Sequence, residues 1–312
     1  MDIESISNIV VAGAGIMGTS IAGIFAKNGY NVTVFCHRAS SIEKGRQLIH
    51  VNQQTSIKEG IISENESEQL LKNIIFTVEE NCFDVADFVI ESIVEKLNVK
   101  HEFWKMVSLR AKKDAILTSN TSGLSITKLA EAVDLPERFS GFHWVNPPHI
   151  VPLIEIIKGE KTSEETSQVI YKLAEKIGKK PVLIKDAKGF CLNRFQFAVL
   201  REAMHIVESG IASKEDVDNV FKYGLGIRYA CLGPFEIADL GGLDTFYNIA
   251  SYLFEDLSDR KDVPNLLKDC YENKEFGVKN GKGFYDYSNG RDQEIIKKRD
   301  ADFIKISKCL YE

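Results

Sequence analysis

The chain has 312 residues, a length sufficient for two domains and a sizeable core. Of these residues 44% are hydrophobic and 27% are charged, as is usual in globular proteins. Its formal net charge of -6 predicts neither a nucleic acid partner nor a membrane partner, and no apolar run approaches the length of a membrane-spanning helix. The first residues lack a basic targeting signal and the six cysteines form no C-x-x-C pair, so we expect a cytoplasmic protein without disulfides or a metal site.

Residues 9–38 predict a strand, a glycine-rich turn, a helix and a second strand, in the order and size of a βαβ unit. The glycines of the turn, between the strand at 9–12 and the helix at 17–27, have the spacing G-x-G-x-x-G. The first permits a tight turn, the second lets the backbone approach a diphosphate, and the third allows close packing of helix on strand. Unpaired N–H groups and the helix dipole favour a diphosphate at the helix N-terminus. The residues expected to bind a dinucleotide here are Gly13, Gly15, Ile16, Met17 and Gly18.

The residues after the second strand, at 32–35, favour NADP(H) over NAD(H). An NAD site usually has an acidic residue here, which accepts hydrogen bonds from the ribose. This chain has Cys36, which would not repel a 2′-phosphate, and Arg38 can bind such a phosphate through its planar donors with help from His37. The alternative is that Arg38 is a solvated loop residue and that the site takes NAD without the acid.

The patterns further along the chain change character near residue 186. Residues 40–73 predict two antiparallel helices projecting from a sheet, with a break at Glu59 and Gly60 and with Lys58 near the tip. Further strands are expected at 88–90, 115–118, 139–144, 153–157 and 181–184, and further helices at 99–112, 126–132 and 163–177. Later segments are mostly helical, at 191–208, 214–223, 234–239, 244–257 and 291–310. We therefore predict a doubly wound, Rossmann-type α/β domain with a parallel sheet over residues 1–186 and an all-helical domain over residues 187–312.

A histidine and a glutamate in neighbouring strands are candidates for acid/base chemistry. His143 ends one predicted strand, and Glu155 lies in the next strand between two isoleucines, where a carboxylate is costly unless it has a partner. A strand-loop-strand arrangement would bring the two together, and a buried carboxylate would orient the histidine and make it more basic. Ser122, in a polar loop after a strand, and Asn193 are further candidates for holding an alcohol or carbonyl oxygen. The alternatives are structural roles as a core histidine, a solvent-facing glutamate, or caps and turns.

Several motifs beside the glycine-rich turn stand along the chain: Glu-Lys-Leu-Asn-Val-Lys at 95–100, Ser-Asn-Thr-Ser at 119–122, Gly-Phe-His at 141–143 with Asn-Pro at 146–147, Leu-Ile-Glu at 153–155, Gly-Phe-Cys-Leu-Asn-Arg at 189–194 and Gly-Pro-Phe-Glu at 233–236. In this order and at these separations they closely resemble the L-3-hydroxyacyl-CoA dehydrogenases, including the bacterial 3-hydroxybutyryl-CoA enzymes. The resemblance covers nearly the whole chain.

The resemblance implies a role for each candidate in the reaction. His143 would be the general acid/base and Glu155 its orienting partner. Ser122 and Asn193 would bind the 3-oxygen of the substrate, with Asn146 lining the site.

It also implies how the larger ligands bind. The residues that match the nicotinamide half of the family's site are Glu95, Lys100 and Asn120. The helices at 40–73 would bind CoA, with Lys58 near its phosphates. The C-terminal helical domain would form a homodimer.

Two segments depart from the family pattern. Residues 36–38 are closer to the phosphate-binding Asn-Arg-Thr of 6-phosphogluconate dehydrogenases. Residues 144–149 resemble the gulonate dehydrogenase and lambda-crystallin branch, which oxidises a hydroxy acid without CoA. The sequence therefore predicts a reversible, NADP(H)- or NAD(H)-dependent dehydrogenase of short-chain 3-hydroxyacyl-CoA. The alternatives are a dehydrogenase of a free 3-hydroxy acid such as gulonate or carnitine, or a nucleotide-binding protein with a structural or sensing role.

Overall fold

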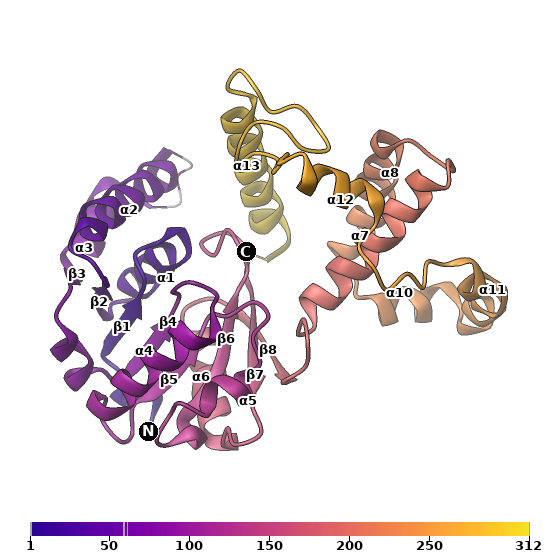
Figure 1. Ribbon diagram of the computed structural model, residues 1–312. Coiled ribbons are helices and arrows are strands. Elements are labelled where there is room, and N and C mark those ends of the chain that lie inside the picture. Colours follow the sequence, from indigo (N-terminus) through magenta and orange to yellow (C-terminus); the bar gives the residue numbers. More distant parts are fainter. Residues whose placement is uncertain (1, 59, 61, 312) are drawn as a thin grey trace. The chain divides into compact units, whose positions relative to one another are not determined.

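The computed structural model describes residues 2–58, 60 and 62–311 (Figure 1). The chain divides into two compact units, Met1–Asn193 and Arg194–Glu312. Of the predicted helix break at Glu59 and Gly60, Glu59 lies outside the described residues.

The first unit contains an eight-stranded sheet with the order β3-β2-β1-β4-β5-β6-β7-β8. Its strands are β1 (Asn8–Ala12), β2 (Asn31–Phe35), β3 (Ile74–Thr77), β4 (Phe88–Glu91), β5 (Ile116–Ser119), β6 (Phe139–Trp144), β7 (Leu153–Lys158) and β8 (Lys180–Lys185). The strand order reverses between β1 and β4, and in open α/β sheets ligands bind at the carboxyl ends of the strands beside such a reversal.

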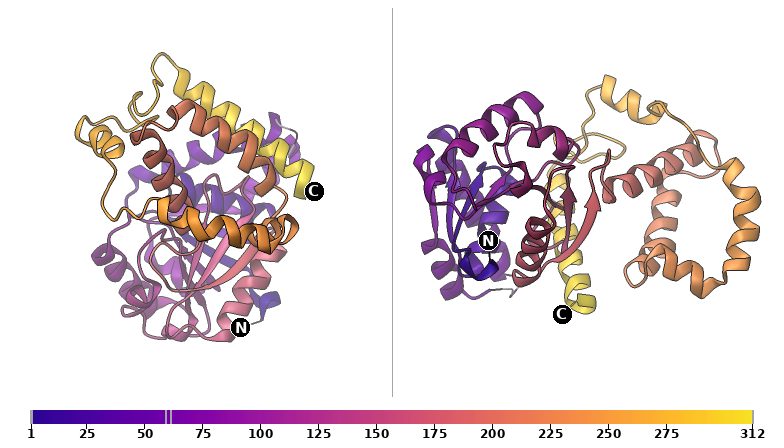
Figure 2. Two further views of the ribbon diagram at one scale, coloured as in Figure 1. Left: turned by 90° about the vertical axis from the view of Figure 1, so that its right-hand side faces the viewer. Right: turned by 90° about the horizontal axis from the view of Figure 1, so that it is seen from below.

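Helices cover both faces of this sheet (Figures 1 and 2). The helices of the unit are α1 (Ile16–Lys27), α2 (Ser40–Lys58), α3 (Glu64–Lys72), α4 (Leu97–Arg110), α5 (Ile126–Ala130) and α6 (Glu164–Lys176). Adjacent residues of β1 belong to different apolar clusters: Val11 shares one with Phe25 of α1, and Val10 shares the other with Trp104 of α4. The central strands are therefore buried on both sides, which is why they are apolar along their whole length.

The doubly wound α/β fold is confirmed, but the sheet is not wholly parallel. β1 to β6 run parallel, β7 is antiparallel to β6, and β8 is parallel to β7. The connection of residues 145–152 from β6 to β7 is too short for a crossover helix, so the chain must reverse there. The sequence patterns also miss β3, a four-residue edge strand whose side chains are mostly half-exposed.

The second unit is helical, as predicted. Its helices are α7 (Leu192–Glu208), which begins in the first unit, α8 (Lys214–Val220), α9 (Ile227–Tyr229), α10 (Pro234–Gly241), α11 (Leu243–Asp256), α12 (Asn265–Glu272) and α13 (Arg291–Tyr311), with a π-helical segment Phe221–Gly226. The helices from α7 to α12 lie spread out rather than in a closed bundle (Figure 2). Among the described residues of this unit, the buried apolar side chains are those of Met204, Ile237 and Ile304.

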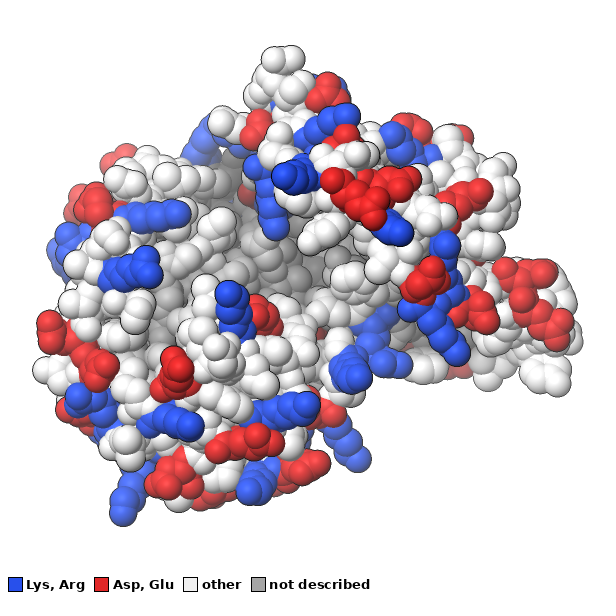
Figure 3. Space-filling view, viewed as in Figure 1, with Lys and Arg blue, Asp and Glu red and all other residues white. Residues whose placement is uncertain are grey.

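The surface shown in Figure 3 carries positive and negative side chains interspersed. None of the helices formed by the described residues has the length and apolar character that a membrane crossing requires. The described residues also contain no group of three or more His, Cys, Asp or Glu arranged to hold a metal ion.

Candidate active site

The three glycines of the turn between β1 and α1 differ in the space around them. A Cβ at Gly13, where φ is +115°, would lie 2.4 Å from the Ser92 carbonyl oxygen, and a Cβ at Gly18 would lie 1.9 Å from the Gly13 carbonyl oxygen. These two glycines are therefore required by packing. At Gly15, by contrast, a Cβ would have nothing within 4 Å, and α1 begins after it without a side-chain cap. The open space at Gly15 and the uncapped N–H groups of α1 fit a bound diphosphate.

The three residues after β2 that were predicted to determine the cofactor differ in their burial. Cys36 is buried in the apolar core, and burial raises the pKa of its thiol. His37 and Arg38 are exposed. Arg38 and His37 are therefore the two of these residues that can contact a 2′-phosphate, since the Cys36 side chain is buried in the core.

His143 and Glu155 form a buried pair. They are direct partners in the antiparallel register of β6 and β7. The Nδ1 atom of His143 lies 2.7 Å from Oε2 of Glu155, and the two residues are 5% and 0% exposed. The ring of Phe190 lies beside the imidazole, with 5.6 Å between ring centres. The strand-loop-strand arrangement predicted from the sequence thus brings this histidine and this carboxylate together.

The N-terminus of α7 supplies the other contacts of Glu155. Its Oε1 atom accepts hydrogen bonds from the N–H groups of Cys191 (2.9 Å) and Leu192 (2.8 Å). The first N–H groups of a helix have no partner within the helix, and the helix dipole there favours an anion. Burial alone would raise the pKa of Glu155, but the hydrogen bond with His143 and these two N–H groups lower the pKa below its usual value. The carboxylate is therefore ionised at neutral pH.

An ionised Glu155 can only accept hydrogen bonds, so the proton in the His143–Glu155 contact belongs to Nδ1 of the imidazole. In the neutral imidazole with this tautomer, the opposite nitrogen of His143, Nε2, carries the lone pair. An imidazole in this state can take a proton from an alcohol and can return it in the reverse direction.

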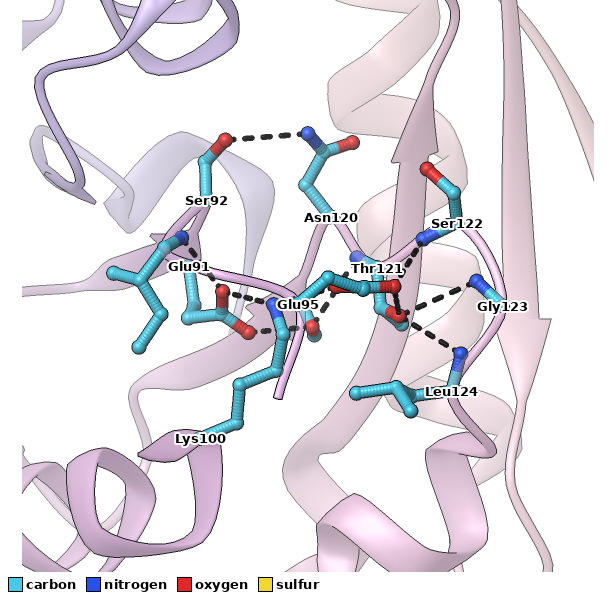
Figure 4. Close-up of polar contacts among 11 residues, drawn as sticks. Glu91, Ser92, Glu95, Lys100, Asn120, Thr121, Ser122, Gly123 and Leu124 are labelled. Carbon is cyan, nitrogen blue, oxygen red and sulfur yellow. Dashed lines mark hydrogen bonds and ion pairs between the residues drawn. The ribbon is translucent and has the colours of Figure 1, made fainter. Parts of the chain in front are cut away.

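Ser122 lies in the turn after β5 and is held through both its N–H and its carbonyl, and Figure 4 shows the N–H contact with Glu95. Its N–H donates to Oε1 of Glu95 (3.0 Å), and its carbonyl accepts a hydrogen bond from Nδ2 of Asn193 (2.8 Å). Thr121 donates its hydroxyl to the same Glu95 oxygen. The Ser122 hydroxyl points away from Glu95, toward the side on which the Asn120 amide lies (Figure 4). The structure thus brings Ser122, Asn193 and Glu95 together.

A buried lysine connects Glu95 to the interior of the sheet. Lys100, 1% exposed, forms ion pairs with Glu91 and with Oε2 of Glu95, the latter at 3.2 Å. Glu91 is fully buried and also accepts a hydrogen bond from the Ser119 hydroxyl (2.6 Å). Burial alone would raise the pKa of Glu95, but the Thr121 hydroxyl and the Lys100 charge lower the pKa below its usual value. The charged network fixes the backbone from which Ser122 projects.

Comparison with known proteins assigns the chain to a family. Residues 8–187 match the description "3-hydroxyacyl-CoA dehydrogenase, NAD binding domain", and residues 189–287 match "3-hydroxyacyl-CoA dehydrogenase, C-terminal domain". The chain belongs to the 3-hydroxyacyl-CoA dehydrogenase family. It is therefore an oxidoreductase with an NAD-binding domain, and the family resemblance of its motifs is confirmed.

Relatives in the 3-hydroxyacyl-CoA dehydrogenase family bear different substrate names. The chain is 34% identical to "5-formyl-3-hydroxy-2-methylpyridine 4-carboxylate 5-dehydrogenase" of Mesorhizobium japonicum, over 98% of each chain. It is 36% identical to "Probable 3-hydroxybutyryl-CoA dehydrogenase" of Deinococcus radiodurans, over 89% of this chain and 99% of the relative. A similar fold is seen in the crystal structure of a 5-formyl-3-hydroxy-2-methylpyridine 4-carboxylic acid 5-dehydrogenase, which is described as an NAD+-dependent dismutase. Its chain is 34% identical to this one, over 97% of this chain and 98% of the crystal chain, with a TM-score of 0.90.

The remaining predicted site residues lie at different places in the first unit. Asn120 joins the Ser122 turn to the histidine strand, because its Oδ1 accepts a hydrogen bond from the Trp144 N–H (2.8 Å). Asn146 is exposed on the loop after β6, and Lys58 is exposed at the end of α2. No contact given by the described residues joins Lys58 to the His143–Glu155 pair.

Two site features escape the sequence reasoning. The main-chain donors to Glu155 carry no side-chain signal, since any residue except proline at the start of α7 would supply them. Glu91, in contrast, could have been found, because it ends the apolar strand Phe88–Glu91 in the same way that Glu155 interrupts its own strand. A carboxylate in an apolar run requires a partner, which here is Lys100.

Proposed function

We propose that the chain catalyses the reversible oxidation of the 3-hydroxyl group of a 3-hydroxyacyl-CoA with a nicotinamide dinucleotide, and that His143 is its general acid/base. The observation that supports this is the buried His143–Glu155 pair, whose carboxylate is held by two N–H groups of α7. Oxidising an alcohol requires a base for its hydroxyl proton, and this pair leaves Nε2 of His143 as that base.

The protein's part in the proposed reaction is position and proton transfer. A bound nicotinamide cofactor supplies the hydride acceptor. Nε2 of His143 takes the 3-hydroxyl proton, and Glu155 stabilises the imidazolium that forms because its charge is buried and opposite. The Ser122 hydroxyl and the Asn193 amide hold the 3-oxygen as its charge changes. In the reverse direction the imidazolium returns the proton.

The acyl-CoA substrate is supported by the family to which both parts of the chain belong and by the 3-hydroxybutyryl-CoA relative. In this proposal α2 and α3 contact the CoA, with Lys58 near its phosphates. A short acyl chain is the substrate proposed first.

A second candidate, a hydroxy compound with a free carboxylate and no CoA, is favoured by a specific observation. The relative named for a pyridine carboxylate covers 98% of this chain, including the α13 region, whereas the 3-hydroxybutyryl-CoA relative covers 89%. The sequence at 144–149 also resembles the branch that works without CoA.

Separate observations support NAD and NADP(H) as the cofactor. The family description and the neighbouring crystal structure name NAD, while the exposed Arg38 and His37 and the absence of an acid after β2 support NADP(H). We expect Arg38→Ala to raise the Kd of NADPH by about tenfold, the loss of one charge-assisted contact, and to leave the Kd of NADH unchanged. Titration of each nucleotide by fluorescence measures both constants. A wild-type enzyme that binds NADH more tightly than NADPH would refute the NADP(H) preference.

One set of rate measurements tests the proposed function. Initial rates are recorded with acetoacetyl-CoA and with free acetoacetate, each with NADH and with NADPH. Turnover of acetoacetyl-CoA supports the first candidate, and turnover of acetoacetate alone supports the second. If neither compound is reduced, the proposed 3-hydroxy substrates are wrong.

A further inference from the structure

Lys179 is a buried cation that the proposed reaction does not use. It lies between α6 and β8, is 8% exposed, and has no carboxylate within ion-pair distance among the described residues. Its ammonium donates to the carbonyl oxygens of Pro148 (2.5 Å) and Val151 (2.9 Å) and lies 5.5 Å from the centre of the Trp144 ring. Burial lowers the pKa of this lysine to about 8. A buried charge without an opposite charge costs stability, so the stability of the fold does not explain a lysine here.

The segment that Lys179 holds is the proline loop, residues 145–152, which connects β6 to β7. Pro147 and Pro148 have no N–H, so the loop has fewer main-chain donors than carbonyl acceptors. The N–H groups of Ile150 and Val151 both donate to the Pro147 carbonyl, at 3.1 and 3.0 Å. Lys179 donates to the carbonyls of Pro148 and Val151, which, among the described residues, accept no hydrogen bond from the loop's own main chain. The lysine thereby joins two points of the loop, at Pro148 and at Val151.

The proline loop begins two residues after His143, at the carboxyl end of β6, and carries the exposed Asn146. Carboxyl ends of strands are where ligands bind in sheets of this kind. We infer that Lys179 is a positioning residue that holds the proline loop, and with it Asn146, in the shape that receives the substrate beside His143. This inference rests on the proposed function, in which Asn146 lines the substrate site. Lys179 itself does not touch the reacting atoms.

The first arm of the test needs no turnover. Lys179→Met is compared with Lys180→Met, which makes the same change at the exposed neighbouring residue. Hydrogen exchange of the full chain with NADH bound should show the Ile150 and Val151 amides at least ~10-fold less protected in Lys179→Met, because the turn loses two charge-assisted hydrogen bonds. The amides of β1 should be unchanged, as should every amide in Lys180→Met. Unchanged protection of Ile150 and Val151 would overturn the inference.

The second arm measures steady-state kinetics with whichever of acetoacetyl-CoA and acetoacetate the wild-type enzyme reduces. In Lys179→Met the KM should rise by about tenfold, while kcat and the Kd of NADH change by less than about threefold, because binding geometry rather than the acid/base pair is lost. An unchanged KM together with a loosened loop contradicts the substrate role. If wild-type protein reduces neither compound, the proposed function fails while the exchange arm still decides whether Lys179 holds the loop.

A folding failure is also decisive. Lys179→Gln keeps a donor without the charge and is made alongside Lys179→Met. If both variants unfold in the presence of NADH while Lys180→Met folds, Lys179 is a structural residue and the inference is wrong.

Discussion

In the proposed reaction, the role of His143 depends on which of its ring nitrogens carries a proton, and the contact with Glu155 determines this. Because Glu155 is buried, ionised and already bonded to two N–H groups of α7, it has a fixed place from which to accept the Nδ1 proton. The same carboxylate then balances the charge that appears when Nε2 takes a second proton. A single contact thereby sets the tautomer and the orientation of the imidazole.

His143→Ala is expected to lower kcat by at least ~100-fold, the usual contribution of a general acid/base, and to leave the Kd of NADH nearly unchanged. Stopped-flow or steady-state rates and nucleotide titration measure the two quantities. Ser140→Ala, a buried change on the same strand, is the control and should retain turnover. A His143→Ala enzyme with near-normal kcat would remove this histidine from the mechanism.

Lys179 gives a pH dependence of stability whose sign is fixed. Its pKa is about 8 in the folded protein and 10.5 when unperturbed, so between these values the unfolded chain binds more protons. The free energy of unfolding should therefore rise with pH in this window, by up to about 1.4 kcal/mol per pH unit from this group. Well below pH 8 the lysine is charged in both states and contributes no slope.

Urea unfolding of wild-type protein and of Lys179→Met at pH 7.5, 8.5 and 9.5 measures this contribution. The free energy of unfolding of the wild type minus that of Lys179→Met should rise with pH, because only the wild type has the titrating amine. Lys180→Met should follow the wild type at every pH, since its ammonium is exposed. A constant difference between wild type and Lys179→Met would mean that the buried amine titrates normally.

The sequence predicts part of this site for a physical reason. A carboxylate among isoleucines must be paired, and a histidine one short loop away is the available partner, so the amino-acid sequence alone is enough to match His143 with Glu155. Contacts through the main chain leave no such signal. Ser122 is held by its N–H and carbonyl, and the carbonyl ligands of Lys179 depend on how the proline loop folds.

At the scale of elements, the three glycines of the β1–turn–α1 unit have two different kinds of surroundings. Gly13 and Gly18 make room for neighbouring backbone, whereas Gly15 leaves open space in front of α1. Mutations within these six residues can therefore test packing and the proposed diphosphate binding separately.

Gly15→Ala should fold with unchanged thermal stability, because its Cβ meets no protein atom, but the Kd of NADH should rise at least ~10-fold, because the methyl group occupies the space of the diphosphate. Gly18→Ala should lose thermal stability, because its Cβ would collide with the Gly13 carbonyl. Thermal melts and nucleotide titrations distinguish the two. Equal nucleotide affinity in Gly15→Ala and wild type would place the diphosphate elsewhere.

The direction of β7 relative to β6 could not be predicted from the hydrophobic pattern alone. Apolar runs located β6 and β7, but alternation and hydrophobicity are the same for parallel and antiparallel neighbours. The direction follows from the short connection between them, which excludes a crossover. The same reversal places His143 directly opposite Glu155.

At the scale of the whole molecule, the two units differ in how far they bury their apolar residues. The first buries two extensive clusters against its sheet. In the second, long apolar side chains on α10 and α11 are largely exposed, such as Phe235 at 85% and Phe254 at 72%. Exposed apolar area of this kind marks an association surface. We propose that a second copy of the chain covers it, in a homodimer formed through the C-terminal helices.

Sedimentation equilibrium should therefore give twice the 35.0 kDa mass of one chain. Phe254→Asp should shift the protein toward the monomer and lower its thermal stability, because a charge buried in the interface has no partner. Leu109→Asp provides the matched control: it places the same charge at an 87% exposed leucine of α4 in the first unit and should leave the mass unchanged. A wild-type monomer would mean that the second unit is stable with its apolar helices in water. Dissociation by Leu109→Asp as well would move the association surface to the first unit.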